Sequence, residues 1–232
     1  MKLVYEGKAK RVYEGPEPGR VRMEFKDSAT AFNGQKRAEI AGKGVVNAAV
    51  SARLFQWLGD QGVETHYLAT VDDRQLDVEQ LTMIGLEVVV RNRVAGSLHQ
   101  RTGLAEGTPI AIPVVEFYYK NDALGDPLLN DDHIRLLGLA SPDLVARLKQ
   151  EALRINQLLS AFFQDRQLIL VDFKLEFGWN PNGELKLGDE ISPDTCRLWD
   201  EATHERLDKD RFRRDMGGVE DAYQEIYRRV MA

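Results

Sequence analysis

Three charged side chains, Asp172, Lys174 and Glu176, alternate with apolar residues in the segment 168–177. Alternation with a period of two is typical of a β-strand, so the charged side chains share one face and the apolar ones share the other. Residues 168–171 are all apolar, which indicates that the strand is central and covered on both faces. We therefore expect the charged face to line a covered site where carboxylates bind a metal ion. A solvated charged face is the alternative interpretation.

A hairpin turn is expected to bring Asp189 to this face. Asn182-Gly183 is the signal of a two-residue type I′ turn, and the register that follows from it places Glu176 directly opposite Asp189. Two opposed carboxylates repel unless a cation lies between them. Magnesium held by one or two carboxylates and by phosphate oxygens is the common arrangement in ATP sites. The pattern predicts a magnesium site formed by Glu176 and Asp189.

Gly7-Lys8-Ala9-Lys10 is a candidate phosphate-binding segment between two strand signals. Glycine lets the backbone approach a phosphate closely, and alternating lysines place two ammonium groups on one side of an extended chain. A solvated hairpin tip is the alternative. The segment is not a Walker A loop, and residues 42–44 lack both the first glycine and the Ser/Thr of that motif. No G-x-G-x-x-G is present, so neither a dinucleotide fold nor an ordinary protein-kinase loop is predicted.

Arginines form the second group of candidate binding residues. Arg91 ends the apolar run 88–90, and a guanidinium at a strand end is suited to bidentate contact with a carboxylate or phosphate. A second basic cluster is interleaved with aspartates, so a salt-bridged surface is its alternative interpretation. Its members are Arg197, Lys209, Arg211, Arg213 and Arg214.

The spacing of apolar residues and the positions of glycine and proline predict the strands and helices that could position these residues. An amphipathic helix is predicted over 40–58, ended by Gly59 and Gly62, and a second one begins with Ser141 as its cap and Pro142 in its first turn. The segment 103–140 is predicted to be rich in loops. Strands are predicted at 3–5, 11–13, 21–25, 65–71, 86–91 and 168–177, and a last helix at 219–230. This mixture gives an α+β fold class with a domain boundary near 82–85.

Composition excludes several classes of protein. The chain has 232 residues, a formal charge of −6 and 29% charged residues, which describes a globular protein with an acidic balance and argues against a general nucleic-acid binder. No apolar run approaches the ~20 residues of a membrane span, and the first residues lack the pattern of a signal peptide. A single cysteine, Cys196, excludes an internal disulfide framework. We expect a cytoplasmic protein that binds no membrane.

Taken together in chain order, these motifs resemble the phosphoribosylaminoimidazole-succinocarboxamide synthase (SAICAR synthetase) family over nearly the whole chain. The arginine block at 89–97 and the block at 172–178 are the most specific. The matching blocks are Gly7-Lys8-Ala9-Lys10, Ala31-Phe32-Asn33-Gly34, 89–97, Lys120-Asn121-Asp122, 172–178, 188–194, Arg197-Leu198-Trp199-Asp200 and 208–213.

The resemblance implies an ATP-dependent ligase of purine biosynthesis. Such an enzyme joins the carboxylate of 5-aminoimidazole-4-carboxylate ribonucleotide (CAIR) to the amine of L-aspartate, giving SAICAR, ADP and phosphate. The implied fold has two α+β domains, here 1–84 and 85–232, with an ATP cleft between them, related to the kinase and ATP-grasp architectures. The implied partners are ATP, CAIR, L-aspartate and Mg²⁺, with no nucleic acid, and a homo-oligomer, as a dimer, is expected.

The resemblance also implies roles for individual residues. Lys174 and Asp172 are expected at the reacting groups, and Glu176 and Asp189 on magnesium. The residues expected to bind ATP are Lys8, Lys10, Met83, Glu87 and Asp122. Those expected to surround CAIR are Arg91, Ser97, Arg197, Lys209 and Arg213.

Two other functions are compatible with parts of this pattern. A small-molecule kinase of related architecture would use the same ATP cleft with a hydroxyl acceptor and would not need aspartate. A non-catalytic nucleotide-binding module would bind ATP yet tolerate loss of the Glu176 and Asp189 pair. The complete set of blocks favours the ligase over both.

Overall fold

The computed structural model describes residues 1–31 and 36–232. Part of the block Ala31–Gly34 that contributes to the resemblance therefore lies outside the described residues. The N-terminal sheet has the strand order β1-β2-β3-β7-β6, all antiparallel. Its strands are β1 (Leu3–Glu6), β2 (Lys10–Glu14), β3 (Arg20–Phe25), β6 (Tyr67–Thr70) and β7 (Gln75–Glu79). The predicted strands at 3–5, 11–13, 21–25 and 65–71 are confirmed, whereas β7 was not predicted.

A second sheet carries the order β10-β9-β8-β11-β12, and a further strand, β13, also pairs with β11. Its strands are β8 (Thr82–Arg93), β9 (Pro109–Tyr119), β10 (Leu128–Leu129), β11 (Leu168–Trp179), β12 (Leu185–Gly188) and β13 (Cys196–Asp200). The predicted strand at 168–177 is confirmed, and β8 is longer than predicted. The division expected between residues 84 and 85 falls within β8 and stays a prediction.

The expectation of a loop-rich segment over 103–140 is wrong for β9. Pro109 and Pro113 led to that expectation, because proline cannot donate a ladder hydrogen bond. Pro109 is the first residue of β9, and Pro113 lies in the register shift between the pairs Arg91–Val114 and Arg93–Pro109, outside the reach of β10. Proline is tolerated at both positions for that reason.

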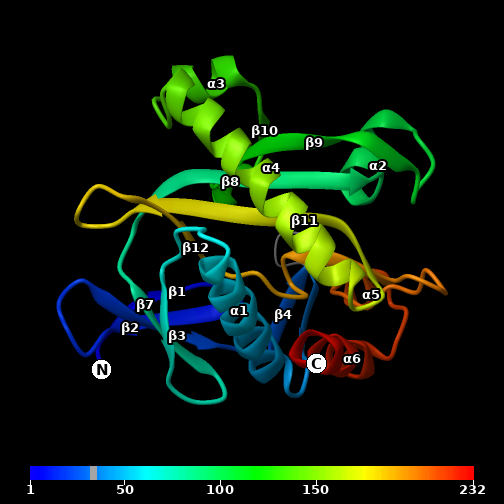
Figure 1. The fold of residues 1–232 in the computed structure, drawn as a ribbon, viewed down its shortest axis with the longest axis horizontal. Helices are drawn as coiled ribbons and strands as arrows, with labels where there is room; N and C mark the ends of the chain where they lie inside the picture. The colour runs from blue at the N-terminus through cyan, green and yellow to red at the C-terminus, as the bar shows by residue number, and fades with distance from the viewer. Residues whose placement is uncertain (32–35) are drawn as a thin grey trace.

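Two long helices cover the sheets. Figure 1 shows the sheets one above the other, with α4 (Pro142–Gln164) lying across β8 and β11, and with α1 (Lys43–Asp60) and α6 (Val219–Met231) beside each other near the N-terminal sheet. One large apolar core joins α1, α4 and α6 to β8 and β11. Helix α1 begins three residues later than predicted and includes Gly59, whereas α4 and α6 agree with the predicted positions. The remaining elements are β4 (Ser28–Ala31), β5 (Lys36–Glu39), α2 (Gly96–Thr102), the 3-10 turn η1 (Asp122–Leu124), α3 (Asp131–Leu136) and α5 (Asp210–Arg213).

The turn between β11 and β12 differs from the predicted two-residue turn. Asn180 N donates to Glu184 O and Gly183 N donates to Asn180 O, both at 3.0 Å, so Asn180 and Glu184 close a three-residue loop, 181–183, beyond the ends of the two strands. The side chain of Asn180 selects this loop, because its Oδ1 accepts from the backbone N–H groups of Asn182 and Glu184. Gly183 has a φ of 77°, the left-handed conformation that a three-residue hairpin loop requires at its last position.

The extra loop residue shifts the hairpin register by one. Glu176 pairs with Gly188, so the prediction that it pairs with Asp189 is wrong. Asp189 follows β12 with a φ of 58°, a left-handed conformation that is uncommon for a residue with a side chain. Within the described residues, none of the helices is long and apolar enough to cross a membrane.

The cap of α4 provides a test of this fold. Ser141 Oγ accepts a hydrogen bond from Leu144 N at 3.2 Å. We expect Ser141→Ala to lower the free energy of unfolding by about 1 kcal/mol, because it leaves that N–H without its partner. Ser141→Asp keeps an acceptor and should stay within a few tenths of the parent, as measured by urea unfolding. Equal stability of the alanine and aspartate variants would contradict this role of Ser141.

Candidate active site

A cavity of about 390 Å³ lies between the two sheets. One wall is formed by the loop between β1 and β2, and the opposite wall by β8, β9 and β11. The segments 190–197 and 209–213 close its side. Eight of the residues predicted to act in the site line this cavity: Lys8, Glu87, Arg91, Asp172, Lys174, Arg197, Lys209 and Arg213.

The register between β8 and β11 explains why residues far apart in sequence meet here. Asp172 pairs with Arg91, and Glu176 pairs with Glu87. Because side chains alternate along both strands, the charged residues of β11 and the odd-numbered residues of β8 project from one face of the sheet. On the other face, Phe173, Leu175 and Phe177 of β11 and the even-numbered residues 84–90 of β8 pack in the large core. The predicted separation of charged and apolar faces is confirmed over 172–177. It does not extend to Val171, which lies at a register shift and packs in a separate cluster with Trp199.

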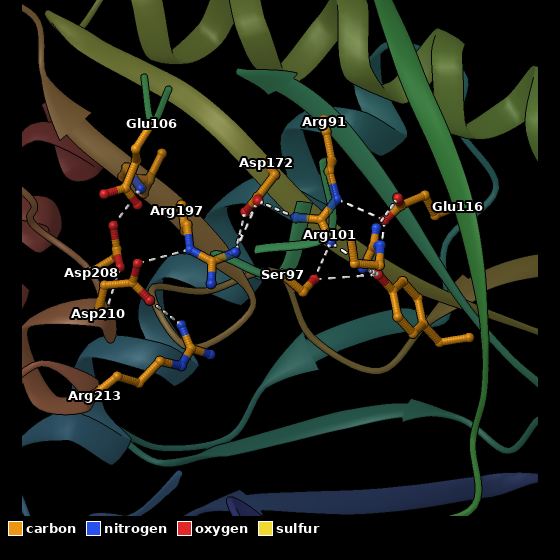
Figure 2. Close-up of polar contacts among 12 residues, drawn as sticks. Arg91, Ser97, Arg101, Glu106, Glu116, Asp172, Arg197, Asp208, Asp210 and Arg213 are labelled. Carbon is orange, nitrogen blue, oxygen red and sulfur yellow. Dashed lines mark hydrogen bonds and ion pairs between the residues drawn. The ribbon is translucent and has the colours of Figure 1, made fainter. Parts of the chain in front are cut away.

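Asp172 is the junction of a buried chain of ion pairs. Its Oδ2 accepts from Arg91 Nη1 at 2.8 Å and from Arg197 Nη1 at 2.9 Å. Arg197 Nε in turn donates to Asp210 Oδ2 at 2.9 Å, and Arg213 Nη1 donates to Asp210 Oδ1 at 2.7 Å. Figure 2 shows these side chains arranged in a row along the site. Asp172 thus contacts two guanidinium groups at once.

The row continues on the other side of Arg91. Its Nε donates to Glu116 Oε2 at 2.7 Å, and Glu116 Oε1 accepts from Arg101. Tyr118 accepts from both arginines and donates to Glu116. We call the alternating set the arginine ladder; its members are Arg213, Asp210, Arg197, Asp172, Arg91, Glu116 and Arg101.

In the ladder, the combined effect of the neighbouring charges on the pKa of the arginines exceeds the effect of burial. Burial alone would lower the pKa of Arg91 and of Arg197, but the neighbouring carboxylates raise the pKa of both guanidinium groups above its ordinary value. Every guanidinium nitrogen of Arg91 already donates to a protein acceptor, with Nη2 reaching Ser97 Oγ at 3.0 Å. A bidentate contact of Arg91 with a substrate therefore needs these bonds to rearrange.

A second charged group lies further along the same face. Lys174 Nζ contacts Glu176 Oε1 at 2.6 Å, Glu87 Oε1 at 3.0 Å and Asp189 Oδ2 at 3.6 Å. The sequence predicted a cation between Glu176 and Asp189, and the ammonium group of Lys174 contacts both. We call this set the lysine cluster; its members are Lys10, Lys120, Lys174, Glu87, Glu176, Asp189 and Glu190.

Lys10 links the two sheets within this cluster. From the start of β2, its Nζ reaches Asp189 Oδ1 at 2.5 Å and Glu190 Oε1 at 3.0 Å. Burial alone would lower the pKa of Lys10, but the charges of Asp189 and Glu190 raise it above the ordinary value. Lys8 lies nearer the surface and pairs with Asp122 at 2.7 Å. The four charged residues expected to bind ATP thus occur in two groups: Lys10 and Glu87 in the lysine cluster, and Lys8 paired with Asp122.

Met83 lies near two glycines, Gly178 and Gly188, at the far end of this face. A Cβ added to Gly178 would lie 3.1 Å from Met83 Sδ, and one added to Gly188 would lie 3.5 Å from Met83 Cε. A side chain at Gly178 would therefore crowd Met83, whereas the contact from Gly188 to Met83 would be an ordinary one. Met83 and Glu87 are both odd-numbered residues of β8, and of the two only Glu87 lines the cavity.

Comparison with known proteins identifies the family to which the chain belongs. The SAICAR synthetase family model matches residues 3–230. The chain belongs to the SAICAR synthetase family. It is 55% identical to the phosphoribosylaminoimidazole-succinocarboxamide synthase of Coprothermobacter proteolyticus over 98% of this chain and 97% of that protein. The corresponding enzyme of Gloeobacter violaceus is 57% identical over 99% and 94% of the two chains.

Solved structures agree with this membership. The phosphoribosylaminoimidazole-succinocarboxamide synthase from Ehrlichia chaffeensis superposes with a TM-score of 0.97 at 43% identity, covering 100% of this chain and 99% of that one. A SAICAR synthetase in complex with ADP gives a TM-score of 0.95 at 49% identity, covering 97% and 96%. The resemblance, the α+β fold and SAICAR synthetase activity in de novo purine biosynthesis are confirmed. The roles of individual residues remain predictions.

Several residues of this SAICAR synthetase site were missed by the sequence reasoning. Glu116 and Tyr118 lie on β9, whose two prolines argued against a strand. Asp194 was also missed: it accepts from Lys43 Nζ at 2.7 Å and from Tyr223 Oη at 2.6 Å, and it pairs with Lys209 at 3.4 Å. No spacing signal links α1, α6 and the loop of Asp194, since only the folded chain brings them together.

Asp208 contributes to the free energy of unfolding of the protein in a way that depends on pH. It is fully buried, and its two oxygens accept from Leu198 N at 2.9 Å and from Asp210 N at 2.7 Å. Burial, reinforced by the charge of Asp210, raises the pKa of Asp208 to about 7. The folded protein therefore keeps a proton here over a pH range in which the unfolded chain, with an ordinary pKa of about 4, has lost it.

We expect this contribution to be complete below pH ~4 and to be lost as the pH rises through about 7. Asp208→Asn removes the titration. The free energy of unfolding of the parent minus that of the variant should fall by roughly 1–3 kcal/mol between pH 5 and 8, measured by urea unfolding at each pH. A difference that stays flat, or rises with pH, would show that Asp208 is ionised in the folded protein.

Proposed function

We propose that the cavity between the two sheets binds the three substrates of SAICAR synthesis: CAIR at the arginine ladder, ATP at the lysine cluster, and L-aspartate between them. The observation that carries this proposal is the charge pattern of a single sheet face. One end presents guanidinium groups in a row, and the other presents lysines with carboxylates. A site with two chemically different ends suits a reaction that joins a nucleotide carboxylate to an activating phosphate donor.

At the arginine end we assign Arg91, Ser97, Arg197, Lys209 and Arg213 to CAIR. Arg197 supports this assignment, because its Nη2 has no acceptor among the described residues and can donate to a ligand. Ser97 accepts from Arg91, and its Oγ lies 3.5 Å from Tyr118 Oη, so its hydroxyl hydrogen could exchange this long contact for a phosphate oxygen. Guanidinium groups bind phosphates and carboxylates through charge-assisted hydrogen bonds.

At the lysine end we assign Lys8, Lys10, Met83, Glu87 and Asp122 to ATP. The related SAICAR synthetase solved in complex with ADP supports nucleotide binding by this fold. Met83 offers an exposed apolar side chain suited to one side of an adenine ring. Lys8 lines the other side of the cavity, and Lys10 pairs with its lining residue Glu190, so both ammonium groups are near enough for phosphate oxygens to be their expected ligands.

Glu176 and Asp189 fit a magnesium ion by the chemistry of their donor atoms. Both are carboxylates that contact the same ammonium group, so their oxygens already converge on one cation. Among the described residues there is no cluster of three or more metal-binding side chains, which suits an ion that completes its shell with phosphate oxygens and water. When bound, Mg²⁺ would neutralise the phosphate oxygens during transfer.

The reaction then needs two displacements. The CAIR carboxylate oxygen attacks the terminal phosphorus of ATP, and the bond to ADP breaks, giving an acyl phosphate. The amine of L-aspartate attacks the acyl carbon, loses a proton, and expels phosphate as the amide forms. Lys174 is placed by three carboxylates to donate to the transferred phosphoryl oxygens. Asp172 would act by holding Arg91 and Arg197 beside the reacting carboxylate. Dimerisation and a cytoplasmic location stay predictions.

Dependence on aspartate tests the proposed function. We expect ADP release at full rate only when CAIR, ATP, magnesium and L-aspartate are all present, and the new amide should form in equal amount. ADP can be followed by a coupled assay and the product by mass spectrometry. Full-rate ADP production without aspartate would instead identify a kinase, and ATP binding without turnover would identify a regulatory module.

The magnesium assignment is tested by a matched pair of variants. Asp189→Asn and Glu190→Gln each remove one carboxylate from Lys10, so both should lower the melting temperature of the metal-free protein. Only Asp189→Asn should raise the magnesium concentration needed for half-maximal rate at saturating ATP, by roughly tenfold or more. If the two variants share the magnesium curve of the parent, Asp189 has a structural role only.

A further inference from the structure

Gly96 lies in close contact with the guanidinium group of Arg197. It is the first residue of α2, and its φ is 51°. A Cβ at this position would lie 2.4 Å from Arg197 Nη2, 2.8 Å from Cζ and 3.1 Å from Nη1. Cβ atoms do not approach other atoms this closely, so any side chain at residue 96 must displace the guanidinium group.

The guanidinium group cannot move aside without losing its partners. Arg197 Nη1 donates to both oxygens of Asp172, at 3.0 and 2.9 Å, and Nε donates to Asp210 at 2.9 Å. Both carboxylates are buried, and a buried carboxylate that loses its cation is strongly destabilised. Arg197 is therefore fixed from two sides, and its Nη2 lies against Gly96.

We infer that Gly96 is a positioning residue for CAIR: the missing side chain sets where Arg197 Nη2 is presented to the nucleotide. This inference rests on the proposed role of Arg197 in binding CAIR. It explains why a glycine stands between Ala95 and Ser97 in the arginine block. The positive φ and the contact with Arg197 each disfavour a side chain at residue 96, and only the contact involves the guanidinium group.

Gly103 provides a matched control at the other end of the same helix. It ends α2 with a φ of 70°, but a Cβ at this position would meet nothing within 4 Å. Gly96→Ala and Gly103→Ala therefore impose a similar left-handed backbone on alanine. They differ in the collision with Arg197. Both variants should melt below the parent, and any difference in substrate binding reports on the collision.

The experiment measures the KM of each substrate and the melting temperature for the two glycine variants, for Arg197→Ala and for the Gly96→Ala/Arg197→Ala double variant. Gly96→Ala should raise the KM of CAIR roughly ten- to hundredfold, the cost of a lost charge-assisted contact, and change the KM of ATP less than about twofold. Gly103→Ala should leave both KM values near those of the parent. The double variant should bind CAIR no worse than Arg197→Ala alone, because the effect of residue 96 acts through Arg197.

Equal CAIR KM values for Gly96→Ala and Gly103→Ala would overturn the inference, as would additive effects in the double variant. If Arg197→Ala itself leaves the KM of CAIR unchanged, the proposed role of Arg197 fails instead. Should Gly96→Ala not fold, the double variant decides: recovery of folding on removing the Arg197 side chain supports the collision, and failure to recover contradicts it.

Discussion

The pairing of Arg91 with Asp172 across β8 and β11 is the interaction on which the rest of the site depends. It is a ladder pair and an ion pair at once, because the two residues are partners in the strand register and their side chains meet at 2.8 Å. A slip of one residue would send the charged face of β11 into the apolar core. The core therefore fixes the register, and the register fixes which charges meet.

Such a pair is stable only when its remaining hydrogen-bonding capacity is filled. Both side chains are buried, and removing two charges from water costs several kcal/mol per ion before any attraction is counted. Glu116, Ser97 and Tyr118 occupy the other donors of Arg91, and Arg197 occupies the other side of Asp172. Extending the pair into a row satisfies each group in turn and holds the guanidinium planes in fixed positions before a substrate arrives.

Local patterns in the sequence predicted those parts of this arrangement that depend on neighbouring residues. Alternation over 168–177 identified the strand and the face that Asp172, Lys174 and Glu176 share. The hairpin register was predicted wrongly, because the Asn180 side chain stabilises a loop one residue longer than Asn182-Gly183 alone indicates. Contacts such as Asp194 with Lys43 and Tyr223 join three separate elements, so no local pattern reports them. The approach of Arg197 to Gly96 was hidden for the same reason.

Charge balance distinguishes the two ends of the cavity. Within the described residues, four guanidinium groups of the arginine ladder alternate with three carboxylates, so the ladder itself has one positive charge in excess. In the lysine cluster, three ammonium groups face four carboxylates, so that end carries one negative charge in excess. An excess of positive charge favours an anionic nucleotide, whereas an excess of negative charge favours a divalent cation that brings its own phosphates. Under the proposed assignment, this imbalance would orient the substrates, with the phosphate donor at the lysine end and its acceptor at the arginine end.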